Sequence, residues 1–253
     1  MGKLDGRLAW VTGAGSGIGE AAALALAGEG ARLVLTGRRA SPLAELARRI
    51  SATGGEAHAR AGDVTSPASV AEIGRFIEEK FGRLDILVNN AGANIAEREW
   101  HRLTPAGAEQ VISANLASAF YCVTVALPFM RKQKDGILIH TASMAGRFVA
   151  PLSGAAYTAA KHGVVAMSHS LNMEECVNGI RSTAICPGEV ATPILDRRPV
   201  PVSPEDRARM LQAEDCGDLI RYVACLPPHV CINEVLITPT WNRGYIAAQS
   251  RRG

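Results

Sequence analysis

Short runs of aliphatic residues alternate along the chain with longer segments in which apolar residues recur at helical spacing. The runs that we predict as strands cover residues 8–12, 32–36, 57–62, 84–89, 136–141, 181–186 and 231–238. Several are unbroken aliphatic strings, such as Leu33-Val34-Leu35, which is typical of strands covered on both faces. Helical periodicity fills the stretches between them, for example residues 42–53 and 66–81.

Strand and helix in repeated alternation predict an α/β fold, a Rossmann-like doubly wound parallel sheet of about seven strands with helices on both faces. No repeat, low-complexity tract or interdomain linker interrupts the pattern, so we expect residues 1–253 to form a single domain. One long irregular segment, rich in proline and charge, follows residue 187. Long loops in compact domains are usually functional, so we expect residues 187–212 to form a substrate-binding loop or lid.

Composition narrows the class of partner. Hydrophobic residues make up 47% of the chain and aromatic residues only 5%, so aliphatic packing must dominate the core. The net charge is +3, and apart from Arg197-Arg198 and the last few residues the basic side chains are spread out, which argues against a nucleic-acid surface. We find no apolar stretch typical of a signal peptide at residues 1–5 and expect no segment long and apolar enough to span a membrane.

Cysteine and histidine spacing predicts no metal site. The six cysteines include no Cys-x-x-Cys pair, and the histidines show no ligand spacing. We therefore expect reduced, mostly buried thiols in a cytoplasmic protein. His140 falls within a predicted strand, where a hydrogen-bonded core histidine is expected, and Trp10 and Trp100 are interpreted as packing residues.

A glycine-rich loop follows the first predicted strand. It reads Thr12-Gly13-Ala14-Gly15-Ser16-Gly17-Ile18-Gly19, and a helix-forming run follows at residues 20–27. Glycine lets the backbone turn sharply and approach a diphosphate, whose charge is met by the helix N-terminus. A tight turn alone would also need glycine. The place of the loop at the first strand-to-helix junction favours dinucleotide binding.

Two arginines, Arg38 and Arg39, end the second predicted strand, where NAD-binding folds carry an acidic residue for the ribose 2′-hydroxyl. The planar guanidinium donates in parallel to two phosphate oxygens, so this pair favours the 2′-phosphate of NADP(H) over NAD(H). The alternative is that both arginines merely begin the solvated face of the next helix.

Tyr157 and Lys161 stand four apart in a predicted helix, residues 155–172, so that both side chains lie on one face. A phenol with an ordinary pKa of about 10 is a poor base at neutral pH, and a nearby ammonium lowers that pKa. Ser143 follows the strand at residues 136–141, where strand ends form the crevice of a doubly wound sheet. The three residues suit proton transfer to or from an oxygen that Ser143 holds.

These motifs together resemble the short-chain dehydrogenase/reductase family, over about residues 5 to 240. The resemblance rests on Thr12-Gly-x-x-x-Gly-Ile-Gly19, Asn89-Asn90-Ala91-Gly92, Asn115, Ser143, Tyr157-x-x-x-Lys161 and Pro187-Gly188. It implies an NAD(P)-dependent oxidoreductase that transfers a hydride between nicotinamide C4 and a carbonyl or secondary alcohol carbon. It also implies a homotetramer, or a homodimer, built on the helices that contain Asn115 and Tyr157.

The resemblance also implies roles for particular residues. Tyr157 would be the general acid/base, and Lys161 would lower its pKa and bind the nicotinamide ribose. Ser143 would orient the substrate carbonyl, and Asn115 would hold a water that links Lys161 to solvent. The implied cofactor-binding residues are Gly13, Gly15, Ser16, Gly17, Ile18, Gly19, Arg38, Arg39, Asp63, Val64, Asn89, Ala91, Gly92, Tyr157, Lys161, Pro187, Gly188, Val190 and Thr192.

Three features depart from the family pattern. Ser143 and Tyr157 are one residue further apart than is usual, so we expect residues 144–153 to bulge. Ser16 stands where NADP-using members often carry a basic residue. The C-terminal part lacks the frequent Asp-Gly-Gly ending and is closer to NADP-dependent hydroxy-acid and serine dehydrogenases.

Several residues around the predicted catalytic residues could contact the substrate. They are Ser143, Met144, Arg147, Tyr157, Gly188, Asn94, Ile95 and the loop 189–209. Arg197, Arg198, Arg207, Arg209 and Arg147 either clamp an anionic group or are solvated side chains on a lid. Two other functions remain as alternatives. An epimerase or dehydratase is disfavoured by the short C-terminal region, and a nucleotide-sensing regulator is disfavoured by the intact catalytic residues.

Overall fold

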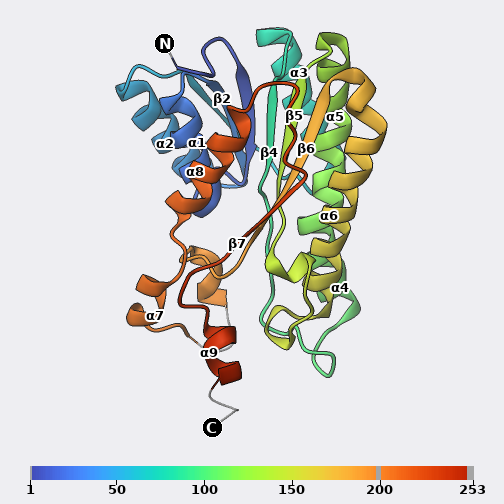
Figure 1. The fold of residues 1–253 in the computed structure, drawn as a ribbon. Helices are drawn as coiled ribbons and strands as arrows, with labels where there is room; N and C mark the ends of the chain where they lie inside the picture. The colour runs from blue at the N-terminus through green and yellow to red at the C-terminus, as the bar shows by residue number, and fades with distance from the viewer. Residues whose placement is uncertain (1, 198–200, 250–253) are drawn as a thin grey trace.

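A seven-stranded parallel sheet organises the computed structural model, which describes residues 2–197 and 201–249. Its strands are β1 (Leu8–Thr12), β2 (Arg32–Gly37), β3 (Ala57–Ala61), β4 (Ile86–Asn89), β5 (Gly136–Thr141), β6 (Ile180–Pro187) and β7 (Glu234–Ile237). They lie in the order β3-β2-β1-β4-β5-β6-β7 (Figure 1). All neighbours are parallel, so every strand ends at the same edge of the sheet.

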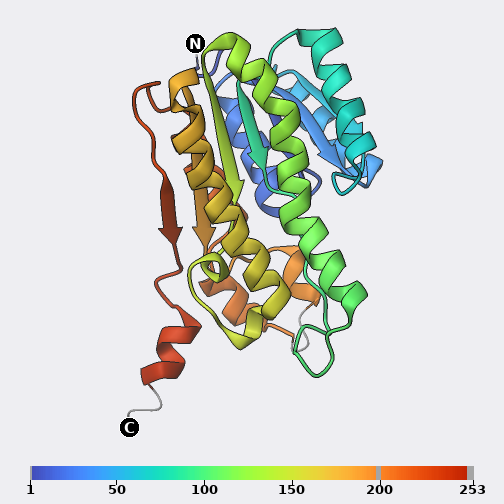
Figure 2. The ribbon, with the colours of Figure 1, turned by 90° about the vertical axis from the view of Figure 1, so that its right-hand side faces the viewer.

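Helices cover both faces of the sheet. One face carries α1 (Gly17–Gly28), α2 (Ala40–Ala52) and α8 (Ala213–Ala224). The other carries α3 (Pro67–Phe81), α5 (Ser118–Gln133) and α6 (Ala155–Glu175) (Figures 1 and 2). The shorter helices α4 (Pro105–Ile112), α7 (Pro204–Arg209) and α9 (Arg243–Gln249) lie toward the edge where the strands end.

Side chains of each strand divide between two cores because successive residues of a strand point to opposite faces. In β1, Leu8 and Trp10 pack with the α3, α5 and α6 face, whereas Ala9 and Val11 pack with the α1, α2 and α8 face. All five residues of β1 are buried, as expected from its continuous apolar run. This packing confirms the doubly wound α/β fold.

The strand order reverses between β1 and β4, which adjoin although two strands separate them along the chain. The connections from β1 and β4 therefore leave in opposite directions and open a crevice above the strand ends, the usual ligand position in such sheets. All seven predicted strands are present with boundaries within about three residues, and β7 is the most shortened.

The expectation that no segment is long and apolar enough to span a membrane was wrong. Residues 110–130 contain no charged side chain, and the continuous helical run Pro105–Gln133 has a window of mean hydropathy 1.6, long and apolar enough by composition to cross a membrane. The same run supplies a core helix of the fold. Within α5, Cys122, Val123 and Ala126 are buried against the sheet, which accounts for the apolar composition of this face.

Two packing predictions need correction. Trp10 is buried and donates from Nε1 to the Thr36 hydroxyl at 2.9 Å, but Trp100 is 81% exposed. His140 is fully buried, as expected, yet neither ring nitrogen has a hydrogen-bond partner among the described residues. Burial, with a smaller effect of the Lys161 charge, lowers the pKa of His140 to about 3. This histidine is therefore neutral at physiological pH.

Candidate active site

The loop after β1 closes tightly against the segment that follows β4. Gly13 and Gly17 have φ angles of 63° and 57°, a region that favours glycine. A Cβ at Gly13 would lie 3.0 Å from Ala91 Cα, and one at Gly19 would lie 2.4 Å from the Gly13 carbonyl oxygen. Side chains are thus excluded here by neighbouring backbone, which leaves the backbone itself facing the crevice.

Thr12 links these two segments. Its hydroxyl accepts hydrogen bonds from the backbone N–H groups of Asn90 and Ala91, both at 3.0 Å. Asn90 Nδ2 in turn donates to the Thr12 carbonyl oxygen at 3.2 Å. The tips of β1 and β4 are therefore held together below the N-terminus of α1, where Ser16 is the N-cap residue.

A cavity of about 1410 Å³ opens over these strand ends. Its wall includes every predicted cofactor-binding residue except Gly19 and Asn89. Gly19 packs behind the loop on Gly13, and Asn89 is buried and donates to the Ala119 carbonyl oxygen at 2.9 Å. Both lie behind the cavity wall, and their role in cofactor binding stays a prediction.

The four predicted catalytic residues all line this cavity. Tyr157 and Lys161 lie one turn apart on α6, with Lys161 Nζ 5.5 Å from the Tyr157 ring centroid. Lys161 is 3% exposed and donates to the Thr141 carbonyl oxygen at 2.7 Å. Burial lowers the pKa of the Lys161 ammonium to about 8, because a low-dielectric surrounding disfavours the charged form.

Asn115 enters the site from a π-helical turn, η1 (Ser113–Ala117), between α4 and α5. Its Nδ2 donates to the carbonyl oxygens of Ala93 and Val111 at 2.6 and 2.8 Å, which orients the amide. Its buried Oδ1 has no hydrogen-bond partner within the described chain. A Cβ at Gly92 would lie 2.7 Å from this Oδ1 and 3.6 Å from Lys161 Nζ, so both atoms border one small space.

Ser143 follows β5 in extended conformation, and its hydroxyl accepts from the Ala145 N–H at 3.1 Å. It thereby caps a 3₁₀ turn, η2 (Met144–Gly146). A second 3₁₀ turn, η3 (Pro151–Ser153), precedes α6. The longer spacing between Ser143 and Tyr157 is therefore taken up by a segment with two short turns, where we expected a bulge.

Arg38 and Arg39 lie where β2 ends, and both are exposed and line the cavity. Asp63 lies after the neighbouring strand β3, and its Oδ1 accepts from the backbone N–H and hydroxyl of Thr65 at 3.0 and 2.9 Å. Two guanidinium groups thus stand at one end of the cavity, apart from the catalytic residues.

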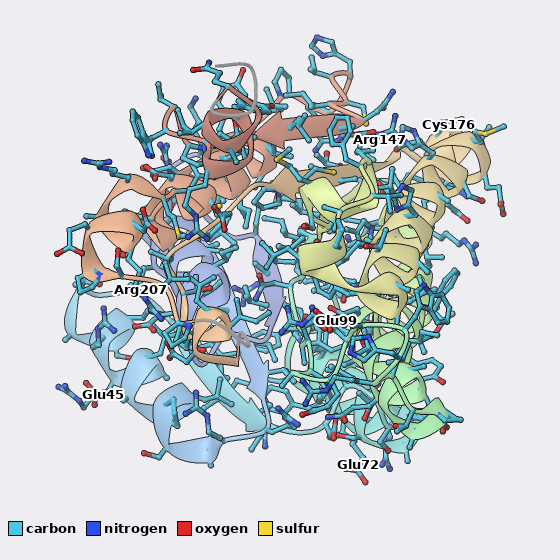
Figure 3. The ribbon with its side chains drawn as sticks, turned by 90° about the horizontal axis from the view of Figure 1, so that it is seen from below. Glu45, Glu72, Glu99, Arg147, Cys176 and Arg207 are labelled. Carbon is cyan, nitrogen blue, oxygen red and sulfur yellow. The ribbon has the colours of Figure 1, made fainter. Side chains whose placement is uncertain are left out.

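The arginines expected near the substrate are engaged elsewhere. Arg147 pairs with Glu234 at 3.0 Å, Arg207 pairs with Asp196, and the Arg209 guanidinium lies 4.9 Å from the Trp241 ring centroid. Figure 3 looks at the strand ends and shows Arg147 and Arg207 well apart. Arg198 lies outside the described residues, as does the side chain of Arg197.

Two other arginines line the cavity and were not predicted. Arg98, in the segment between β4 and α4, is 8% exposed. Arg243, at the start of α9, pairs with Glu189 and Asp206, which lie in the expected lid. No periodicity or motif marks either position, because the path of the loop around Arg98 and of the loop before Arg243 brings them to the cavity.

Comparison with known proteins agrees with this geometry. The family model described as short chain dehydrogenase matches residues 7–200. An uncharacterized oxidoreductase of Staphylococcus epidermidis is 33% identical over 242 residues, which cover 94% of this chain and 100% of that protein. The chain therefore belongs to the short-chain dehydrogenase/reductase family and is an oxidoreductase of that family.

Solved structures share the whole fold. An alcohol dehydrogenase from the archaeon Thermococcus sibiricus, complexed with 5-hydroxy-NADP, superimposes with a TM-score of 0.84 at 25% identity, over 93% of this chain and 97% of that one. A metagenomic short-chain oxidoreductase in complex with NADP has a TM-score of 0.82 at 32% identity, over 94% and 99%. This chain is similar to both over nearly its whole length.

Proposed function

We propose that this protein is an NADP-preferring reductase or dehydrogenase that interconverts a carbonyl group and a secondary alcohol. The observation that carries this proposal is the buried Lys161 ammonium beside the Tyr157 ring, in one cavity wall with Ser143 and Asn115. Burial penalises the charge of Lys161, and its hydrogen bond to the Thr141 carbonyl oxygen leaves that charge unneutralised. A charge kept at this cost beside a phenol suits a lysine that supports proton transfer.

The residues of the cavity fit a dinucleotide. Backbone with no room for side chains at Gly13 and Gly19 allows a diphosphate to approach the N-terminus of α1, whose N–H groups favour an anion. The unpartnered Asn115 Oδ1 and the Lys161 ammonium provide an acceptor and a donor on one side of Gly92. When bound, the nicotinamide supplies or accepts the hydride at its C4 carbon.

The chain's own residues move the proton. The Tyr157 hydroxyl donates its proton to the substrate oxygen during reduction and takes it back during oxidation. Ser143 donates a hydrogen bond to the same oxygen and holds it beside the phenol. The Lys161 ammonium stabilises the phenolate form of Tyr157 electrostatically. Asn115 Oδ1 holds a water beside Lys161, through which the proton reaches solvent.

Preference for NADP rests on Arg38 and Arg39. Their guanidinium groups line the cavity at the end of β2, and that strand ends in Gly37 with no carboxylate for a ribose hydroxyl. A 2′-phosphate would replace water at both arginines with charge-assisted hydrogen bonds. Two similar structures contain NADP or an NADP derivative, which supports the same preference.

We further propose that residues 1–253 form one domain, with residues 187–212 as a lid, and that the protein is a cytoplasmic homotetramer. All six cysteines are free thiols, which suits a reducing compartment. Exposed apolar residues on the helices next to the site, such as Phe120 at 45% and Met173 at 81%, suit burial between subunits. A monomer in light scattering would contradict the oligomer.

The test is a panel of ketones with NADPH, read as loss of the reduced-nicotinamide absorbance, on the wild type and Tyr157→Phe. We expect turnover of at least one ketone, loss of nearly all of it in Tyr157→Phe, and NADPH binding within about twofold of wild type, since the phenyl ring keeps the packing. A fully active Tyr157→Phe variant would contradict the assignment of Tyr157 as the general acid/base. NADPH binding without turnover of any ketone would favour a nucleotide sensor.

A further inference from the structure

The helix that carries Tyr157 and Lys161 begins without a cap of its own. Gly154 is the N-cap residue of α6, and no described side chain makes a capping hydrogen bond there. Gly154 has a φ of 76°, which glycine adopts at little cost. Tyr157 is the third residue of the helix, so its hydroxyl position depends on how the Gly154 turn is held.

The segment that leads into this turn is packed weakly by its own side chains. Between Ser143 and Gly154 lie two short 3₁₀ turns, and among the side chains between them Phe148 is 53% and Val149 84% exposed. Few buried apolar contacts mean low local stability. The turn at residues 152–154, at which α6 begins, therefore needs support from another part of the molecule.

The segment between β4 and α4 supplies this support. Asn94 Nδ2 donates to the Ser153 carbonyl oxygen at 3.0 Å, and Arg98 Nη1 donates to the Leu152 carbonyl oxygen at 3.2 Å. Both side chains are oriented by their own loop. The Ile95 N–H donates to Asn94 Oδ1 at 2.9 Å, and Arg98 Nε donates to the Ile95 carbonyl oxygen at 2.8 Å.

Close packing adds to these hydrogen bonds. A Cβ at Gly154 would lie 2.6 Å from Arg98 Cβ and 2.9 Å from the Arg98 carbonyl oxygen, so the two backbones touch. Asn94 and Arg98 are 7% and 8% exposed, and both line the cavity. In Figure 3, Glu99, the residue after Arg98, lies near the yellow ribbon that leads into α6. Removing either side chain would leave partly buried polar groups without their partner, which costs free energy.

We propose that Asn94 and Arg98 are positioning residues for Tyr157. They hold the Leu152–Gly154 backbone, and with it the uncapped start of α6, so that the phenol stays aligned with Lys161 and Ser143. This inference rests on the proposed function, since it gives Tyr157 a catalytic role. The competing role for Arg98, binding a carboxylate of the substrate, predicts a different result in the same experiment.

The kinetic test compares Arg98→Met, Arg98→Lys and Asn94→Leu with wild type, on methyl benzoylformate and on benzoylformate with NADPH. Arg102→Met, an exposed arginine four residues on, is the matched control. A misplacement of about 1 Å costs on the order of 100-fold in rate. We therefore expect kcat for Arg98→Met to fall about 10- to 100-fold on both substrates, with KM within about twofold.

Two further readouts distinguish positioning from a purely structural role. Arg98→Lys retains a donor and should recover part of the lost kcat. In oxidation of the product alcohol, the acidic limb of the pH–rate profile of Arg98→Met should move to higher pH, because a displaced phenolate is less stabilised by the Lys161 ammonium. A lower melting temperature with kcat and pH profile unchanged would overturn the proposal. So would a KM increase confined to benzoylformate, which would indicate a carboxylate clamp.

Hydrogen–deuterium exchange with NADPH bound provides a readout that needs no substrate. The Thr158 N–H donates to the Gly154 carbonyl oxygen as the first bond of the helix. We expect faster exchange of residues 155–161 in Arg98→Met and Asn94→Leu, and unchanged exchange in α5 and in Arg102→Met. Unchanged exchange of residues 155–161 would overturn the proposal even if neither ketone were a substrate. A fully active Tyr157→Phe would instead overturn the proposed function.

Discussion

Lys161 Nζ donates a hydrogen bond of 2.7 Å to the carbonyl oxygen of Thr141, and so joins α6 to the last residue of β5. The bond leaves the ammonium inside the protein beside Tyr157. No carboxylate of the described residues contributes to the shift of its pKa. The hydrogen bond fixes the side chain without neutralising the charge. The cost of that charge falls on the stability of the fold.

Replacing Lys161 should therefore change how stability depends on pH. The folded-state pKa of about 8 is below the ordinary 10.5, so between these values the unfolded chain binds more protons and stability rises with pH. Relative to Lys161→Met, the cofactor-free wild type should gain up to about 3 kcal/mol from pH 8 to 10.5. Urea unfolding across this range measures it, and parallel profiles for the two proteins would show that the lysine is not penalised.

His140 should destabilise the protein in acid. Its folded-state pKa of about 3 is below the ordinary 6.5, so stability contributed by the neutral form is lost as the pH falls through this window. Relative to His140→Leu, wild type should lose about 3 kcal/mol between pH 6.5 and 4. His101→Gln, at an exposed position, is the control and should follow wild type in acid urea titrations. An unchanged acid profile in His140→Leu would contradict the prediction.

Removing Arg38 should reverse or weaken the cofactor preference. Hydrogen bonds to charged groups contribute about 1.5–3 kcal/mol each, so Arg38→Ser should lower kcat/KM for NADPH by about 10- to 100-fold. The value for NADH should change by less than about threefold, because NADH has no 2′-phosphate for Arg38 to bind. Arg75→Ser, on the exposed surface of α3, serves as control. Equal losses with both cofactors would argue that Arg38 acts on folding.

Arg243 should hold the C-terminal helix on the lid. Its guanidinium donates to Glu189 and Asp206, and these carboxylates raise the pKa of Arg243 further above its ordinary value. In Arg243→Met, exchange of residues 204–212 should become faster, and KM for the ketone should rise several-fold. Arg221→Met removes a comparable ion pair, with Glu29, on the far side of α8, and should alter neither quantity.

The fold could be predicted from local sequence, and so could the placement of Tyr157 and Lys161 on one face of a helix. Buried parallel strands require continuous apolar runs, and the glycines after β1 mark backbone with no room for a Cβ, so both leave a pattern along the chain. Tyr157 and Lys161 are paired by helix geometry alone. The family resemblance implied Gly19 and Asn89 as cofactor-binding residues, and the structure has both behind the wall of the cavity.

Only the tertiary structure decided the surroundings of these residues. That Lys161 is buried, that Asn115 Oδ1 faces Gly92, and that Arg98 reaches the start of α6 all depend on how distant segments meet. So does the lack of a hydrogen-bond partner for the His140 ring among the described residues. The physical reason is that desolvation and hydrogen-bond partners belong to the packed molecule. Periodicity indicates which face of a helix or strand is apolar. A loop has no such periodicity, so its contacts in the folded protein cannot be predicted from its sequence.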